Sequence, residues 1–223
     1  MTNWLKLVKV TLWMISDKKV GCDVSHQLLE NRTMPDYRRW FREGGTYFFT
    51  VVTYNRRNIF SNELARSFLH RAIAEVMAFR PFEMQGIVLL PNHCHCIWKM
   101  PDDDENFSVR WQMIKRRFTK SWLNRRGDDV PVSVSRTKRG ERGVWQRRFW
   151  EHLIVDQQDL ARHMDYIHYN PVKHRYTRCP HQWEHSSFHR WVREGVYEMD
   201  WVCQCNQDNE IPDFKDIAHS VGE

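Results

Sequence analysis

Residues 82–98 carry the pattern of a β-hairpin, and this pattern restricts the fold more than any other part of the chain. Two apolar runs of strand length, residues 82–90 and 93–98, are separated by the turn dipeptide Pro91-Asn92. Strands joined by so short a turn pair antiparallel, because a parallel partner needs a crossover of about a dozen residues or more. An antiparallel sheet is therefore predicted, with the other elements arranged around this hairpin.

Two further segments predict strands. The β-branched and aromatic run at residues 46–53 follows a Gly-Gly break and has the composition of a buried strand. Residues 145–155 return to an aromatic and apolar pattern, which predicts a short strand with a bend. Together with the hairpin these segments supply four strands.

Three helices are expected between and after the strands. Ser61 is a suitable N-cap for a first helix that ends before Pro81, and a second helix covers residues 107–124. A third helix covers residues 157–169 and is expected to end at Pro171. This order predicts an α+β fold: a ferredoxin-like antiparallel sheet with helices packed on one face and residues 93–98 as a central strand.

The chain is interpreted as one domain with an appendage at each end. A length of 223 residues suits one ordinary domain. Residues 1–33 are taken as an N-terminal extension, either disordered or an overlong start, and residues 34–197 as the folded domain. Residues 198–223 contain seven acidic residues against the single Lys215, so they are expected to form a solvated and mobile acidic tail.

Positive charge is concentrated in one stretch. The whole chain carries a formal net charge of +6 and a pI near 9.1, but residues 107–152 alone contain 13 Lys and Arg residues against 4 Asp and Glu residues. Aromatic residues, among them Trp145 and Phe149, are interleaved with these cations. The composition favours binding to a polyanion, although a solvated basic surface over core aromatics explains each single residue equally well.

Composition also bears on location. Six cysteines occur without a recognisable secretory leader, which favours reduced thiols in a cytosol. The apolar residues near the start are interrupted by Lys6 and Lys9 and form a stretch far shorter than a membrane span. We therefore expect a cytoplasmic protein that does not cross a membrane.

The strongest candidate site lies on the second strand of the hairpin. His93 and His95 are separated by one residue, so on a strand both side chains project from the same face and can reach one metal ion. A structural pair of histidines is the alternative for any such motif. A zinc site that also uses Cys94 and Cys96 is disfavoured, because these thiols point to the opposite face.

A second candidate lies on the last predicted helix. Tyr166 and Asn170 are four residues apart and share a helix face, so a phenol and an amide oxygen are presented together. The alternative is a core tyrosine followed by a helix-capping asparagine before Pro171. Tyr169 is a rival for Tyr166, but it lies off the face that Tyr166 shares with Asn170.

These residues resemble the HUH nucleases, and among them the REP-associated tyrosine transposases. The resemblance covers about residues 34–197, with Cys94 as a less hydrophobic middle residue in the histidine motif. The matching segments are Tyr37-Arg38-Arg39, Gly44-Gly45-Thr46-Tyr47-Phe48-Phe49-Thr50, His93-Cys94-His95, Trp145-Gln146-Arg147-Arg148-Phe149-Trp150-Glu151-His152, Asp165-Tyr166-Ile167-His168-Tyr169-Asn170-Pro171-Val172-Lys173-His174 and Ser187-Phe188-His189.

The resemblance implies a DNA-cleaving enzyme. His93 and His95, with Asn170 as third ligand, would hold Mg²⁺ or Mn²⁺ as cofactor. Tyr166 would attack the scissile phosphate and form a 5′-phosphotyrosine intermediate. Tyrosine has an ordinary pKa of about 10, so a nearby base or the field of the metal ion must help to deprotonate it, and the sequence does not identify that base.

The implied partner is single-stranded DNA that contains palindromic, REP-type hairpins. The protein is accordingly expected to act at the nucleoid. The residues expected to contact DNA are Arg38, Arg39, Arg116, Arg117, Arg139, Arg147, Arg148 and Trp145. The acidic tail is expected to lie over this basic surface and compete with DNA. The sequence does not distinguish a monomer from a homodimer. Two alternative functions remain: a DNA-binding regulator without catalytic activity, and an RNA-binding module.

Overall fold

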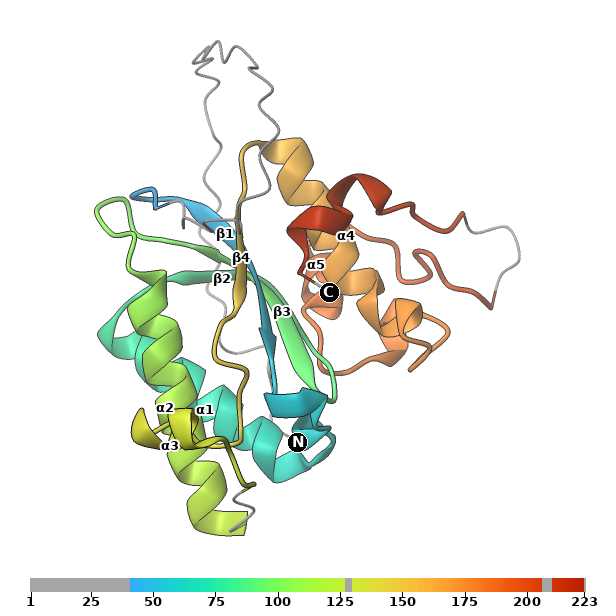
Figure 1. Ribbon diagram of the computed structural model, residues 1–223. Coiled ribbons are helices and arrows are strands. Elements are labelled where there is room, and N and C mark those ends of the chain that lie inside the picture. The colour runs from blue at the N-terminus through green and yellow to red at the C-terminus, as the bar shows by residue number, and fades with distance from the viewer. Residues whose placement is uncertain (1–40, 127–129, 206–209, 223) are drawn as a thin grey trace, which may run out of the picture.

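A four-stranded antiparallel sheet forms the centre of the computed structural model, which describes residues 41–126, 130–205 and 210–222 (Figure 1). The strands are β1 (Thr46–Val52), β2 (Glu83–Leu89), β3 (His93–Lys99) and β4 (Trp150–Leu153). Their order across the sheet is β2-β3-β1-β4. This is the strand order of a ferredoxin-like fold, so the predicted class and the central position of β3 are confirmed.

The predicted hairpin is formed by β2 and β3, and β1 pairs with the other edge of β3. In the β1–β3 register, Val52 lies opposite His93 and Thr50 opposite His95. Because side chains alternate along a strand, β3 sends its histidines to one face of the sheet and its cysteines to the other.

Two helices cover the first face of the sheet: α1 (Glu63–Phe79) and α2 (Phe107–Arg126) (Figure 1). The apolar stripe of α2 is buried as expected, and each fully buried side chain of this size contributes roughly 1.5–3 kcal/mol. The residues of the stripe are Phe107, Trp111, Ile114, Phe118 and Trp122. Short helices complete the connections: η2 (Tyr54–Arg56), η3 (Ile59–Ser61) and α3 (Val134–Lys138).

The N-cap of α1 is Asn62, not the predicted Ser61. The Asn62 side-chain oxygen accepts hydrogen bonds from the backbone N–H groups of Leu64 at 3.0 Å and Ala65 at 3.3 Å. Ser61 is instead the last residue of η3. Both residue types favour N-caps, so only the end of the preceding short helix decides between them.

The second face of the sheet is covered by α4 (Gln157–Lys173), so helices pack on both faces and not only on one. The α4 helix also continues past Pro171, where the sequence predicted its end. Pro171 and Val172 are buried, and the N–H of His174 donates to the Asn170 carbonyl at 3.0 Å. Burial and this bond offset the single backbone hydrogen bond that a proline removes.

The chain after α4 wraps around this second face through η4 (Pro180–Gln182), α5 (Phe188–Arg193) and η5 (Lys215–Ser220) (Figure 1). The predicted tail is solvated only in part, because most of its described residues are exposed but several are packed against the domain. Ile217 and Val221 are buried, and the Trp150 indole donates to the Ser220 carbonyl at 2.7 Å. This segment lies on the α4 face, so it does not cover the basic α2 surface as predicted.

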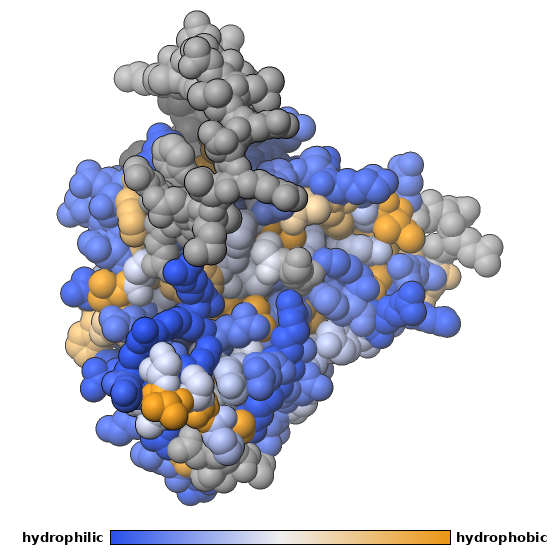
Figure 2. Space-filling model, in the orientation of Figure 1, coloured by the Kyte–Doolittle hydropathy of each residue, from blue (hydrophilic) through white to orange (hydrophobic). Residues whose placement is uncertain are grey.

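Apolar surface is scattered on the outside. The face drawn in Figure 2 is mostly hydrophilic, with small and separate apolar patches. Among the residues that the structure describes, none of the helices combines the length and the hydropathy needed to cross a membrane.

The observed cap of α1 predicts an asymmetry between two neighbouring residues. Asn62→Ala should lower the free energy of unfolding by about 1 kcal/mol, because two backbone N–H groups lose their acceptor. Ser61→Ala should change it by less than about 0.5 kcal/mol. Urea denaturation of both variants measures the difference, and a larger loss in Ser61→Ala would contradict the assignment of the cap.

Candidate functional site

The histidines of β3 lie on one face of the sheet, as the sequence predicted, and this is the face that α4 covers. His93 and His95 are buried, and their ring centroids are 4.9 Å apart with the planes at 81°. Cys94 and Cys96 lie on the opposite side, in the core formed with α1 and α2. Burial raises the pKa of Cys94 to about 12, so this thiol stays protonated and is unsuited to bind metal.

Hydrogen bonds fix the protonation pattern of His95. The Thr50 hydroxyl donates its proton to the Val221 carbonyl at 2.5 Å and lies 2.8 Å from His95 Nδ1. Because the hydroxyl has only one proton, Nδ1 of His95 must donate to it. In a neutral ring Nε2 is then the basic nitrogen that can coordinate a metal.

A similar arrangement exists at His93. Its Nδ1 lies 2.6 Å from the side-chain oxygen of Asn92, an acceptor in the hairpin turn. Nδ1 therefore carries the proton, and Nε2 is again the basic nitrogen. Both histidines are thus held by a neighbour in the form that metal ligation requires.

Tyr166 on α4 faces this pair. Its ring is 5.3 Å from the ring of His95 and perpendicular to it, and its side chain is 1% exposed. Tyr169 lies away from the histidines, where its hydroxyl accepts a 3.5 Å hydrogen bond from Gln204. The structure therefore brings Tyr166, and not its rival, beside the histidine pair.

Asn170 is the third predicted ligand and lies one turn beyond Tyr166 on α4. Its side chain is fully buried, and neither its oxygen nor its nitrogen has a hydrogen-bond partner within the described residues. An unsatisfied buried polar group costs about 1–3 kcal/mol. Such a cost is expected where an amide oxygen is kept for a ligand.

Lys173 was missed by the sequence analysis. Its ammonium group donates a 2.8 Å hydrogen bond to the Tyr166 hydroxyl and lies 4.6 Å from the centre of the ring. A positive charge at this position stabilises the negative form of the phenol. Lys173 is seven residues after Tyr166, on the same helix face, and this spacing was overlooked because the helix was expected to end at Pro171.

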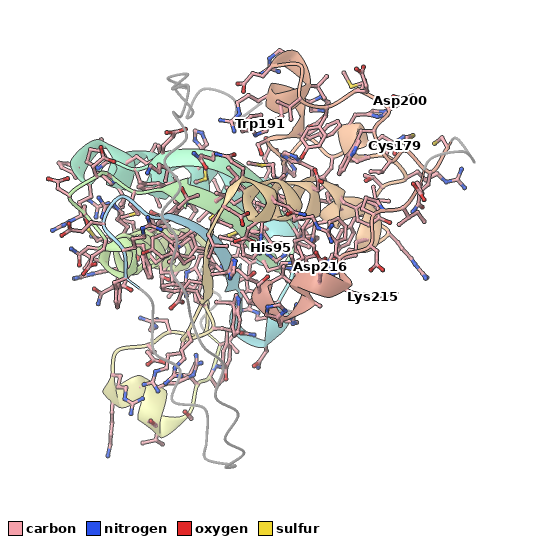
Figure 3. The ribbon with its side chains drawn as sticks, turned by 90° about the horizontal axis from the view of Figure 1, so that it is seen from above. His95, Cys179, Trp191, Asp200, Lys215 and Asp216 are labelled. Carbon is pink, nitrogen blue, oxygen red and sulfur yellow. A yellow bond between two sulfur atoms is a disulfide. The ribbon has the colours of Figure 1, made fainter. Side chains whose placement is uncertain are left out.

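Two more groups complete the surroundings. The ring of His174 is 5.4 Å from the ring of His93. The ring of Phe214, from the C-terminal segment, packs edge-on against Tyr166 at 5.4 Å. Figure 3 shows Lys215 and Asp216 on the His95 side of α4. Tyr166 is therefore almost fully covered, and Phe214 of the C-terminal segment is one of the side chains that cover it.

The described residues include two other groups of potential metal ligands. One consists of His152, Asp159 and His163, and the second of Cys179, His181 and Cys203. In the first group the polar atoms already have partners: His152 Nε2 lies 2.9 Å from the Asp159 carboxylate, His163 Nδ1 lies 2.9 Å from the Asp159 backbone carbonyl, and His163 Nε2 lies 2.9 Å from the Ser220 hydroxyl.

The basic surface forms a groove on the opposite face of the molecule. A hollow of about 610 Å³ between α2 and residues 140–149 is lined by Arg116, Arg147 and Trp145, together with further cations. Most of the Trp145 ring is buried against Phe60 and Phe118, so it also serves the core.

The remaining predicted DNA contacts are spread out. Arg117 lines a neighbouring hollow and forms a 3.1 Å ion pair with Glu75. Arg139 and Arg148 are exposed but do not line the groove. Arg38 and Arg39 lie outside the described residues.

Comparisons of sequence and of structure find relatives with the same family description. No family model matches the chain. The REP-associated tyrosine transposase of Escherichia coli K12 is 41% identical over 169 residues, which is 76% of this chain and 92% of that protein. A Haemophilus influenzae protein assigned to the same family is 41% identical over 168 residues, or 75% of this chain and 93% of that protein. A solved structure of a REP-associated tyrosine transposase bound to a REP hairpin has a TM-score of 0.64 and 37% identity, covering 85% of this chain and 98% of that one.

Beside the site, the buried imidazole of His168 makes the fold sensitive to acid. Its Nε2 lies 2.9 Å from the Ser187 hydroxyl, and burial lowers its pKa to about 3. The unfolded chain takes up a proton near pH 6.5, whereas the folded chain stays neutral. The free energy of unfolding should therefore fall as the pH drops from about 6.5 toward 3, by roughly 1.4 kcal/mol per pH unit from this group.

His168→Gln should remove most of this dependence. Urea denaturation at about pH 7 and about pH 5 measures the slope for the variant and the parent. His219→Gln, which changes an exposed histidine, is the control and should keep the slope of the parent. An equally steep loss of stability in His168→Gln would show that another group is responsible.

Proposed function

Because the chain belongs to the REP-associated tyrosine transposases, we propose that it cuts and rejoins single-stranded DNA at palindromic, REP-type hairpins. The observation that carries this proposal is the position of Tyr166, 5.3 Å from His95 and hydrogen-bonded to Lys173. A phenol beside two histidines held in their ligand form suits phosphodiester cleavage, and neither a regulator nor an RNA-binding module needs it.

His93, His95 and Asn170 are proposed as the ligands of a divalent metal ion, Mg²⁺ or Mn²⁺. The protonation of both imidazoles at Nδ1 and the unsatisfied amide of Asn170 fit this role. Two imidazoles with an amide oxygen suit Mn²⁺ at least as well as Mg²⁺, which prefers oxygen ligands. When bound, the ion supplies Lewis-acid polarisation of a phosphate oxygen.

Tyr166 acts as the nucleophile in this scheme. Its oxygen forms a bond to phosphorus, the bond from phosphorus to the 3′ oxygen breaks, and a 5′-phosphotyrosine and a 3′-hydroxyl result. Lys173 holds the phenolic oxygen and stabilises its negative charge as the proton leaves. Attack by a 3′-hydroxyl on the phosphotyrosine reverses the step and rejoins strands.

The basic groove is proposed to hold the phosphates of the hairpin. Arg116 and Arg147 line it, and Lys115 lies 5.7 Å from the Trp145 ring, which provides cations beside an aromatic surface. Arg147 also pairs with Glu141 at 2.9 Å, so it is oriented before DNA arrives. Action at the nucleoid in the cytoplasm follows from this substrate and stays a prediction.

The role of Tyr166 as the nucleophile can be tested by a cleavage assay. End-labelled single-stranded DNA that contains palindromic repeats is incubated with the protein and Mn²⁺, and products are resolved on a denaturing gel. The parent protein should cleave and form a covalent adduct, both abolished by EDTA. Tyr166→Phe should lose both, because the attacking oxygen is removed.

Tyr169→Phe is the matched control, since it removes a hydroxyl from the same helix on the side away from the histidines. This variant should retain cleavage and the adduct within a few-fold. Binding without cleavage by the parent under every metal would leave a DNA-binding regulator as the function. Loss of the adduct in Tyr169→Phe alone would reverse the assignment of the nucleophile.

A second prediction concerns Lys173. Lys173→Met should reduce cleavage by about tenfold or more near neutral pH and move the rising limb of the pH–rate profile to higher pH, because the phenolate loses its charged partner. Lys173→Arg keeps the charge and should restore part of the rate. An unshifted profile in Lys173→Met would show that the lysine only packs against the ring.

A further inference from the structure

Four potential metal ligands lie together beyond the end of α4, away from the candidate active site. Cys179 and His181 flank the start of η4, and Cys203 and Cys205 lie in the loop that follows α5. The ligand atoms of Cys179, His181 and Cys203 all lie within 4.8 Å of one another, and the Sγ atoms of Cys205 and Cys179 are 3.5 Å apart. Figure 3 shows Cys179 near Asp200 and distant from His95.

Two of these cysteines, Cys179 and Cys203, are joined as a disulfide in the structure. A disulfide accounts for only two of the four groups. The Sγ of the third thiol, Cys205, lies against Cys179, and a nitrogen of His181 lies within 4.8 Å of the Cys179 and Cys203 sulfurs. Three thiols and one imidazole form the Cys₃His donor set that is typical of a structural zinc site.

The imidazole is also held in the form that zinc requires. Nδ1 of His181 lies 3.0 Å from the carbonyl oxygen of Met199, which can only accept. Nδ1 therefore carries the proton, and Nε2 is the basic nitrogen. A ligand histidine that donates its other N–H to a backbone carbonyl is the usual supporting arrangement in zinc proteins.

We propose that, with its thiols reduced, the chain binds one Zn²⁺ through Cys179, His181, Cys203 and Cys205. A small-molecule thiol must first supply two electrons and two protons to open the disulfide, and is itself oxidised to a disulfide. Zinc binding then releases the protons of the three cysteine thiols as the metal–sulfur bonds form. The disulfide and the zinc site are alternative states of one cluster.

The zinc site would fasten the loop at residues 201–205 to the end of α4. The N–H of Gln204 donates to the Arg178 carbonyl at 3.0 Å, and the Gln204 side chain reaches the Tyr169 hydroxyl. Val202 packs in one small cluster with Tyr169 and Val172. The metal would thus stabilise the part of α4 that carries Asn170 and Lys173, without touching the histidine pair. This inference is independent of the proposed function.

The test uses the full chain, reduced with dithiothreitol without oxygen, stripped with EDTA and transferred to metal-free buffer. In the His95→Ala variant, which lacks one ligand of the candidate active site, added Zn²⁺ should bind at one equivalent per chain in competition with a chromogenic chelator and raise the melting temperature. Co²⁺ should give the near-ultraviolet charge-transfer absorption that reports cobalt–thiolate bonds. His95→Ala should keep this absorption, which separates the cluster from the candidate active site.

Cys205→Ser and His181→Ala should each weaken zinc binding by about tenfold or more. Cys205 is exposed and is not part of the disulfide, so its replacement leaves the oxidised fold intact. Cys96→Ala and His219→Ala remove a thiol and an imidazole elsewhere and should bind as the parent does. The proposal is overturned if cobalt–thiolate absorption is absent, if Cys205→Ser binds zinc normally, or if the disulfide resists the reductant.

Discussion

The alternation of side chains along β3 is the constraint on which the rest of the structure depends. This strand is hydrogen-bonded on both edges, and side chains on both of its faces are buried, so other elements must cover each face. The α1–α2 face receives Cys94 and Cys96, and the α4 face receives His93 and His95. A register shift by one residue would put imidazoles into the apolar core and thiols opposite Tyr166, so the hydrophobic pattern of one face fixes the chemistry of the other.

The second requirement is that α4 continues past Pro171. Tyr166, Asn170 and Lys173 are at positions i, i+4 and i+7, which share one helix face only while the helix persists. The proline removes one backbone hydrogen bond in the last turn, and the burial of Pro171 and Val172 offsets that loss. The lysine that contacts the phenol therefore depends on packing at the end of the helix.

Several features that depend on residues close together in the sequence were predicted correctly. The hairpin, the buried stripe of α2 and the shared faces of His93–His95 and Tyr166–Asn170 follow from periodicity alone. Which face of the sheet receives α4 is decided by contacts distant in sequence, and the pattern could not show it. A fully solvated C-terminal tail was predicted because its acidic residues were given more weight than its apolar residues. Phe214, Ile217 and Val221 pack against the second face of the sheet. The cysteine cluster was missed because its two halves, Cys179 with His181 and Cys203 with Cys205, are distant in sequence: Cys203 lies 24 residues after Cys179.

The sheet separates the basic groove from Tyr166, and this arrangement restricts any DNA that uses both. Within the described residues, residues 185–187 cover the outer edge of β2. The Leu89 N–H donates to the His185 carbonyl, and the Ile87 N–H donates to the Ser187 hydroxyl. A DNA strand that contacts both faces must then pass the β4 edge or one of the two ends of the sheet. Trp145, which lines the groove, pairs with Thr53 at the end of the sheet where His93 lies. The hairpin turn connects the two regions there, because Thr53 donates a backbone hydrogen bond to the Asn92 carbonyl and the Asn92 side chain holds His93.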